Sequence, residues 1–123
     1  FWSGLFKDKK MMKKAFSSLH EAGLDKPFPL KYSSSKNHKL MFVDWFVSGY
    51  ESDSCWMHMG LLYLQMLKNA DKNQFFYFKK IYKEKIEKNG NFLEVFNPYG
   101  KPFRSPFYYA DESMLWAANY ITL

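Results

Sequence analysis

The fold is decided by residues 52–90, which read SDSCWMHMGLLYLQMLKNADKNQFFYFKKIYKEKIEKNG. The first half is apolar on more than one face, which predicts a deeply buried helix beginning after Ser52 or Asp53, both competent N-caps. The second half predicts a helix over residues 71–89, apolar on one face and rich in lysine on the other, with Gly90 as its stop. Since the link between them is so short, the two helices should lie antiparallel as an αα-hairpin.

Other elements are predicted on both sides of this hairpin. They are a helix over residues 8–22 with Asp8 as N-cap, a short strand over 39–46, a strand over 92–96, a turn over 97–100, an irregular arm over 101–109 and a last helix over 113–123 capped by Asp111. The chain is therefore expected to be a single segment, mainly α, with a short β-hairpin-like part near residues 91–109.

Composition excludes several classes of protein. The 123 residues suit one domain, and Cys55 is the single cysteine, so neither a disulfide framework nor a cysteine zinc site is available. The three histidines have no metal-ligand spacing, and no phosphate-binding glycine loop is present, so we expect no metal and no cofactor. No apolar run reaches the ~20 residues of a membrane span, and no signal peptide is visible. We expect a cytoplasmic protein without a membrane partner.

The charge pattern says more than the net charge of +6. Arg104 is the only arginine among 18 basic residues, and nucleic-acid readers favour the guanidinium group, so a nucleic-acid partner is disfavoured. Carboxylates are instead interleaved with aromatic residues, which make up 21% of the chain, in the stretches 44–56, 92–96 and 108–116. Sugar sites combine aromatic faces with carboxylates. Solvated lysine faces and acidic helix starts would explain much of the same pattern without a ligand.

Glu94 is the carboxylate that stands out. It lies in the alternating run FLEVF at residues 92–96, where period two would place Phe92 and Phe96 on its side of the strand. A carboxylate on an aromatic surface is suited to general acid or base chemistry. The alternative is that this face is exposed to solvent and that Leu93 and Val95 form the core.

Three motifs resemble the C-terminal part of six-hairpin, (α/α)6-barrel glycosidases, a group that includes amylo-α-1,6-glucosidases, processing α-glucosidases and trehalases. The motifs are GYESDSCWMHMGLLY at residues 49–63, NFLEVFNPYGKP at 91–102 and YYADESMLWAA at 108–118. In this group a tyrosine-bearing loop precedes a Trp…Gly inner helix, and an outer helix leads to a Phe-x-Glu-x-(Tyr/Phe)-(Asn/Asp)-Pro-x-Gly segment. A final inner helix then begins near a tryptophan. The resemblance covers nearly the whole chain.

The resemblance implies a function and a set of site residues. Glu94 would be the general base of an inverting glycosidase, and Trp45, Tyr50, Glu51, Trp56 and Tyr109 would contact the carbohydrate substrate. The general acid in such enzymes is an aspartate from an earlier hairpin, outside this chain. Residues 1–123 would then be the C-terminal portion of a larger (α/α)6 toroid, completed by the rest of the same polypeptide or by a partner subunit, and inactive alone.

The sequence opens on an apolar cluster without methionine and closes inside a predicted helix. These ends are expected of part of a longer chain or of a subunit whose ends dock on a partner, and an arbitrary choice of end points would give the same pattern. Two alternatives stay open: a non-catalytic carbohydrate-binding or interaction module, and a basic nucleic-acid binder using the lysine face of residues 72–88.

Overall fold

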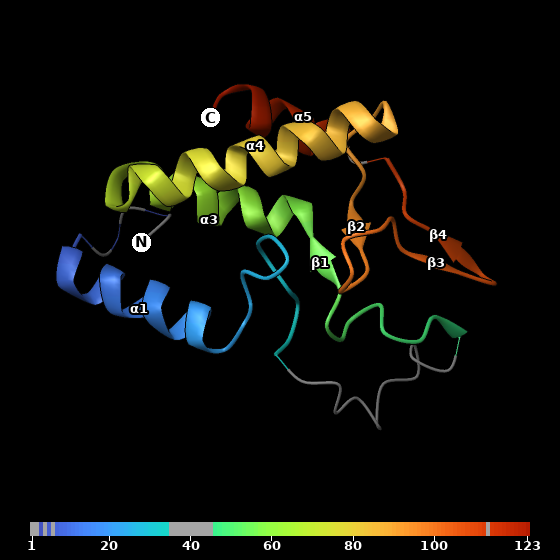
Figure 1. Cartoon of the computed structure of the whole chain (residues 1–123), viewed down its shortest axis with the longest axis horizontal. Helices are drawn as coiled ribbons and strands as arrows, with labels where there is room; N and C mark the ends of the chain where they lie inside the picture. Colours follow the sequence, from blue (N-terminus) through green and yellow to red (C-terminus); the bar gives the residue numbers. More distant parts are fainter. Residues whose placement is uncertain (1–2, 4, 6, 35–45, 113) are drawn as a thin grey trace.

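Figure 1 shows the computed structural model, which describes residues 3, 5, 7–34, 46–112 and 114–123. The helices are α1 (Lys9–Glu21), α3 (Met57–Ala70), α4 (Lys72–Asn89) and α5 (Met114–Ile121), and the strands are β1 (Cys55–Trp56), β2 (Val95–Phe96), β3 (Arg104–Ser105) and β4 (Tyr108–Tyr109). The described part of the chain is mainly helical, as predicted, and it has two small antiparallel strand pairs. The predicted strand at 39–46 lies almost wholly outside the described residues.

Helices α3 and α4 lie side by side and form the predicted hairpin (Figure 1). Their contact is the centre of a core of aliphatic and aromatic side chains: Leu61, Leu64, Leu67, Phe75, Phe78 and Tyr82. Asp71 is the single residue between the two helices. Its N–H donates to the Leu67 carbonyl at 2.8 Å, closing α3, and its Oδ1 accepts from the Gln74 N–H at 3.0 Å, opening α4.

We expect Asp71→Ala to lower the free energy of unfolding by about 1 kcal/mol, because it removes the N-cap bond of α4. Asp71→Asn is the matched control, since an amide oxygen can still accept from Gln74. Urea denaturation followed by circular dichroism measures both. Equal losses in the two variants would contradict a capping role for the carboxylate.

Helix α3 begins later than the sequence predicted. Neither Ser52 nor Asp53 is its N-cap: both lie in a turn, and Trp56, which is extended, holds that position. The backbone before Trp56 is paired with the chain that follows α1, because the Ser33 N–H donates to the Ser52 carbonyl at 2.8 Å and the Tyr32 N–H to the Ser54 carbonyl at 3.0 Å. These bonds outweigh local helix preference and deliver the chain to β1.

Strand β1 pairs antiparallel with β2, with Cys55 opposite Phe96 and Trp56 opposite Val95. The arm after β2 is more regular than predicted, since β3 and β4 form a second antiparallel pair. Pro106 lies in the connection between these strands, where its missing N–H costs no ladder bond. The β-structure near residues 91–109 is therefore two separate pairings, one of them reaching back to the start of α3.

A close approach fixes how α3 meets the rest of the core. The Tyr82 hydroxyl donates to the carbonyl oxygens of Pro29, at 2.6 Å, and Met57, at 2.9 Å. Gly60 faces this contact, and a Cβ built there would collide with the Tyr82 hydroxyl and the Pro29 carbonyl group. The glycine is required by space, since its backbone is ordinary helix.

Helices α1 and α5 pack on this centre from two sides (Figure 1). Helix α1 begins where predicted, with Asp8 Oδ1 accepting from the N–H groups of Lys10 and Met11. Helix α5 places Tyr120 in a stacked contact with Tyr82, with ring centroids 6.4 Å apart. Asp111, the predicted cap of α5, has its Oδ1 bonded to the adjacent Glu112 N–H. None of the helices described is long and apolar enough to cross a membrane.

Candidate functional site

Glu94 joins two parts of the fold through its backbone. Its N–H donates to the Asp111 carbonyl at 2.9 Å, and its carbonyl accepts from the Met57 N–H at 2.9 Å. Met57 is the first residue of α3, and Asp111 lies shortly before α5. The backbone of Glu94 is thus bonded near the N-terminal ends of both helices, and this places its side chain there.

The Glu94 carboxylate is 26% exposed and has a different neighbour at each oxygen. Oε2 accepts a hydrogen bond from the Tyr108 hydroxyl at 3.3 Å. Oε1 lies 3.9 Å from His58 Nδ1, which is within ion-pair distance but too long for a hydrogen bond. One oxygen is therefore engaged, and the other faces a second titratable group.

The Tyr108 hydroxyl belongs to a short chain of tyrosines. Tyr50 lies beside it, with ring centroids 4.9 Å apart. Burial raises the pKa of Tyr50, and its hydrogen bond with Tyr108 raises that pKa further. Burial likewise raises the pKa of Tyr108, while the hydrogen bond from Tyr50 acts in the opposite direction. Both hydroxyls stay protonated at neutral pH, so Tyr108 is a permanent hydrogen-bond donor to Glu94.

His58 packs against two tryptophans. Its ring centroid is 5.3 Å from that of Trp56 in an edge contact and 5.1 Å from that of Trp116. Burial lowers the pKa of His58, opposed by the nearby Glu94 carboxylate. The positive end of the α3 dipole acts in the same direction as burial, since His58 is in the first turn. The structure therefore favours a neutral imidazole.

This pKa predicts how stability changes with pH. In the unfolded chain His58 takes up a proton near its ordinary pKa of about 6.5, whereas the folded protein takes it up only at lower pH. We expect the free energy of unfolding to fall as the pH is lowered from 7 to 5, and to fall less in His58→Leu. Urea denaturation across this interval measures both slopes, and identical slopes would contradict a buried neutral His58.

The residues proposed as substrate contacts have different positions. Tyr50 and Trp56 lie in the aromatic cluster near Glu94, with ring centroids 4.8 Å apart, and Trp56 Nε1 donates to the Ser54 hydroxyl at 2.9 Å. Glu51 Oε2 is buried, with no hydrogen-bond partner among the described residues. Trp45 lies outside the described residues.

Tyr109 is the one predicted contact that the described fold directs elsewhere. It is half exposed, and its ring lies under the Arg104 guanidinium, whose carbon is 4.5 Å from the ring centroid. Its neighbour Tyr108 reaches Glu94 instead. Adjacent residues of a strand point to opposite faces, so a one-residue difference decides which tyrosine joins the site.

The aromatic surroundings of Glu94 also come from other segments than expected. Phe92 and Phe96 are buried, but so are Leu93 and Val95, so burial along this run does not alternate. Phe96 packs against Phe28, with ring centroids 5.4 Å apart. The sequence reasoning missed His58, Tyr108 and Trp116, which tertiary contacts bring together. The signal available was the density of aromatic residues around each of them.

The cysteine and the lysine-rich helix contribute no chemistry to this site. Burial raises the pKa of Cys55 to about 11, so its thiol is not a nucleophile. On α4, Lys80 lies 3.9 Å from Glu84 and Lys83 lies 3.6 Å from Glu87, so part of the lysine face is paired with acidic residues of the same helix. Within the described ranges no three metal-ligating side chains gather.

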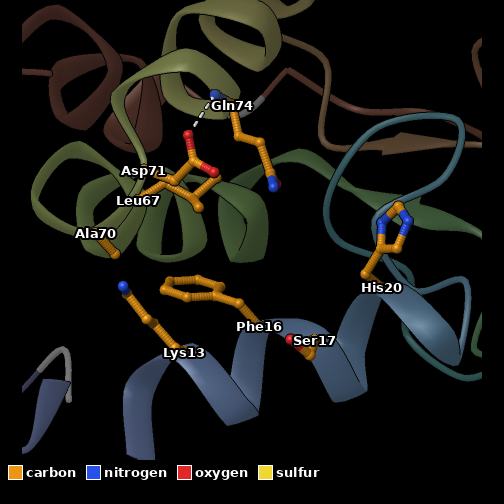
Figure 2. A pocket seen from close by; sticks show the side chains of 8 residues that line it. All are labelled: Lys13, Phe16, Ser17, His20, Leu67, Ala70, Asp71 and Gln74. Atoms are coloured by element: carbon orange, nitrogen blue, oxygen red, sulfur yellow. Dashed lines mark hydrogen bonds between the residues drawn. The ribbon is translucent and has the colours of Figure 1, made fainter. Parts of the chain in front are cut away.

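A separate pocket of about 340 Å³ lies between α1 and the turn that joins α3 to α4 (Figure 2). Phe16 of α1 points into it towards Leu67, beneath Asp71 and Gln74. Two of its polar groups already have partners: Asp71 caps α4, and His20 Nδ1 lies 2.8 Å from Asp25 Oδ2. This pocket is at the opposite end of α3 from Glu94 and shares no lining residue with the site.

Comparison with protein-family models, with curated proteins and with solved structures finds no match for this chain.

Proposed function

We propose that this chain is part of a glycoside hydrolase that cleaves glycosidic bonds with inversion, and that Glu94 is its general base. The observation that carries the proposal is the setting of the Glu94 carboxylate. One oxygen is held by the Tyr108 hydroxyl, and the other faces His58 in a half-buried site beside Trp56 and Trp116. The motif resemblance at residues 91–102 supports the same role for Glu94.

The geometry suits base catalysis for a simple reason. A carboxylate with one oxygen occupied by a permanent donor presents its other oxygen to an incoming water in a fixed direction. The tryptophans supply flat apolar faces of the kind on which sugar rings stack. Inversion needs a second carboxyl group ~6.5–9.5 Å from the base to protonate the leaving oxygen. We assign that group to a carboxylic acid outside this chain.

We also propose an (α/α)6 toroid as the architecture to which this chain belongs. Helices α3 and α4 would be one hairpin of an (α/α)6 toroid, with α3 and α5 as inner helices whose N-terminal ends carry the site. The lysine-covered face of α4 would then be the outer surface of the barrel.

A non-catalytic carbohydrate-binding module is the second candidate. It is favoured by the aromatic side chains of the β3–β4 region, where Phe107 is largely exposed and Tyr109 is half exposed with Arg104 against its ring. Exposed aromatic rings on a rigid hairpin form a platform on which a sugar can bind without being cleaved.

One experiment separates these functions. The full-length protein that carries this chain is incubated with α- and β-linked disaccharides, and proton NMR follows the anomer first released. Hydrolysis that releases the opposite anomer supports an inverting glycosidase. Sugar binding detected by tryptophan fluorescence without turnover supports the binding module. Release of the same anomer would contradict inversion, and neither binding nor turnover would contradict both candidates.

A further inference from the structure

His58 is the titratable group at this site to which the proposed function gives no task. Its Nδ1 atom is buried, and no described protein group hydrogen-bonds to it. Buried polar atoms in native proteins nearly always have a hydrogen-bond partner, so this nitrogen calls for one. The nearest charged acceptor, Glu94 Oε1, is 3.9 Å away.

Both groups also have contacts with other parts of the fold. The imidazole packs against the rings of Trp56 and Trp116. Tyr108 binds the far oxygen of the Glu94 carboxylate, and the backbone of Glu94 is bonded to Met57 and Asp111.

The separation fits one intervening oxygen atom. For an oxygen that makes hydrogen bonds of ~2.8 Å to both atoms, the angle Nδ1···O···Oε1 at that oxygen is about 90°. This is close to the angle between the two O–H bonds of water. A neutral imidazole protonated at Nε2 accepts at Nδ1, and an ionised carboxylate accepts at Oε1. Such an oxygen would donate both hydrogens to the protein and keep its lone pairs free.

We propose that His58 Nδ1 and Glu94 Oε1 together bind a single hydroxyl oxygen, and that this oxygen is the water that attacks the sugar. The second clause rests on the proposed glycosidase function. In that step the water oxygen bonds to the anomeric carbon as the glycosidic C–O bond breaks. One water proton passes to Glu94 Oε1, and the leaving oxygen takes its proton from the external carboxylic acid. His58 keeps its hydrogen bond to the remaining O–H, which becomes the new hydroxyl of the product.

An isosteric pair of variants tests this role in the full-length protein. His58→Asn keeps a hydrogen-bonding atom near the place of Nδ1, while His58→Leu has the same shape without one. We expect His58→Leu to lower kcat by about 10- to 100-fold with KM unchanged, and His58→Asn to restore most of kcat. A rise in KM with kcat unchanged would mean that the oxygen belongs to a sugar hydroxyl and overturns the attacking-water assignment. Equal losses in both variants would overturn the role of Nδ1.

A second measurement does not depend on hydrolysis. In the full-length protein labelled with ¹⁵N-histidine, NMR at pH 7 should show His58 as the Nε2–H tautomer. Glu94→Gln should shift its Nδ1 resonance, whereas the outward-facing control Glu84→Gln should not. A charged imidazole, the Nδ1–H tautomer or no shift in Glu94→Gln would overturn the shared oxygen. If the spectra agree but the full-length protein cleaves no glycoside, the proposed function fails while the two-residue hydroxyl site stands.

Discussion

Glu94→Gln is expected to lower kcat for glycoside hydrolysis by about 10²- to 10⁴-fold in the full-length protein, the usual contribution of a general base. The amide keeps the shape of the carboxylate but cannot take a proton from water. The fold should survive, because Glu94 is anchored by backbone bonds to Met57 and Asp111. An amide oxygen can also still accept from Tyr108.

The measurement compares kcat and melting temperature with those of Glu84→Gln. Glu84 is an exposed carboxylate on the outer face of α4, so its replacement should change neither quantity. If Glu94→Gln retains wild-type kcat, Glu94 is not the base. Glu94→Asp adds a check on geometry: it keeps the charge but withdraws it by one methylene, so its kcat should fall between those of the wild type and Glu94→Gln.

Gly60→Ala should strongly destabilise the protein. In an ordinary helix interior this substitution stabilises by roughly 0.5–1 kcal/mol. Here the new methyl group would overlap the Tyr82 hydroxyl and the Pro29 carbonyl group. Relieving the overlap breaks the bonds from Tyr82 to Pro29 and Met57, leaving buried polar groups unpaired. We expect a loss of ~3–5 kcal/mol, a large part of the stability of a domain of this size.

Tyr82→Phe provides the control for this mechanism. Alone it should cost about 1–2 kcal/mol through the lost hydrogen bonds. In the Gly60→Ala background it should cost less, because removing the hydroxyl also relieves part of the overlap. Urea denaturation of the four proteins gives the coupling energy. Additive effects, or a stabilising Gly60→Ala, would contradict the close approach at this position.

The elements that could be predicted are those specified locally. Asp71 and Gly90 mark the two ends of α4, and the apolar face between them has helical spacing, so its bounds follow from neighbouring residues. The start of α3 depends on bonds from Tyr32 and Ser33, more than 15 residues away, and no local pattern contains them. The sequence therefore placed the helix start too early.

The candidate site follows the same division. Glu94 could be singled out because its own segment carries a turn signal and a motif. His58, Tyr108 and Trp116 are separated along the chain by up to 58 residues and meet only through the β1–β2 pairing and the packing of α5. Whether Tyr108 or Tyr109 turns towards Glu94 depends on the register of a two-residue strand, which the sequence does not specify.

At residue 94 the backbone supports the fold, and the side chain supplies the proposed chemistry. Its N–H and its carbonyl each make a backbone hydrogen bond near the start of a different helix, α5 and α3, and neither hydrogen bond involves the side chain. Natural selection or protein design can therefore replace the reactive side chain at this position, from acid to amide to hydroxyl, without changing the backbone bonds that position it. The same fold can carry different side chains at this position, so a change of reaction there need not be a change of architecture.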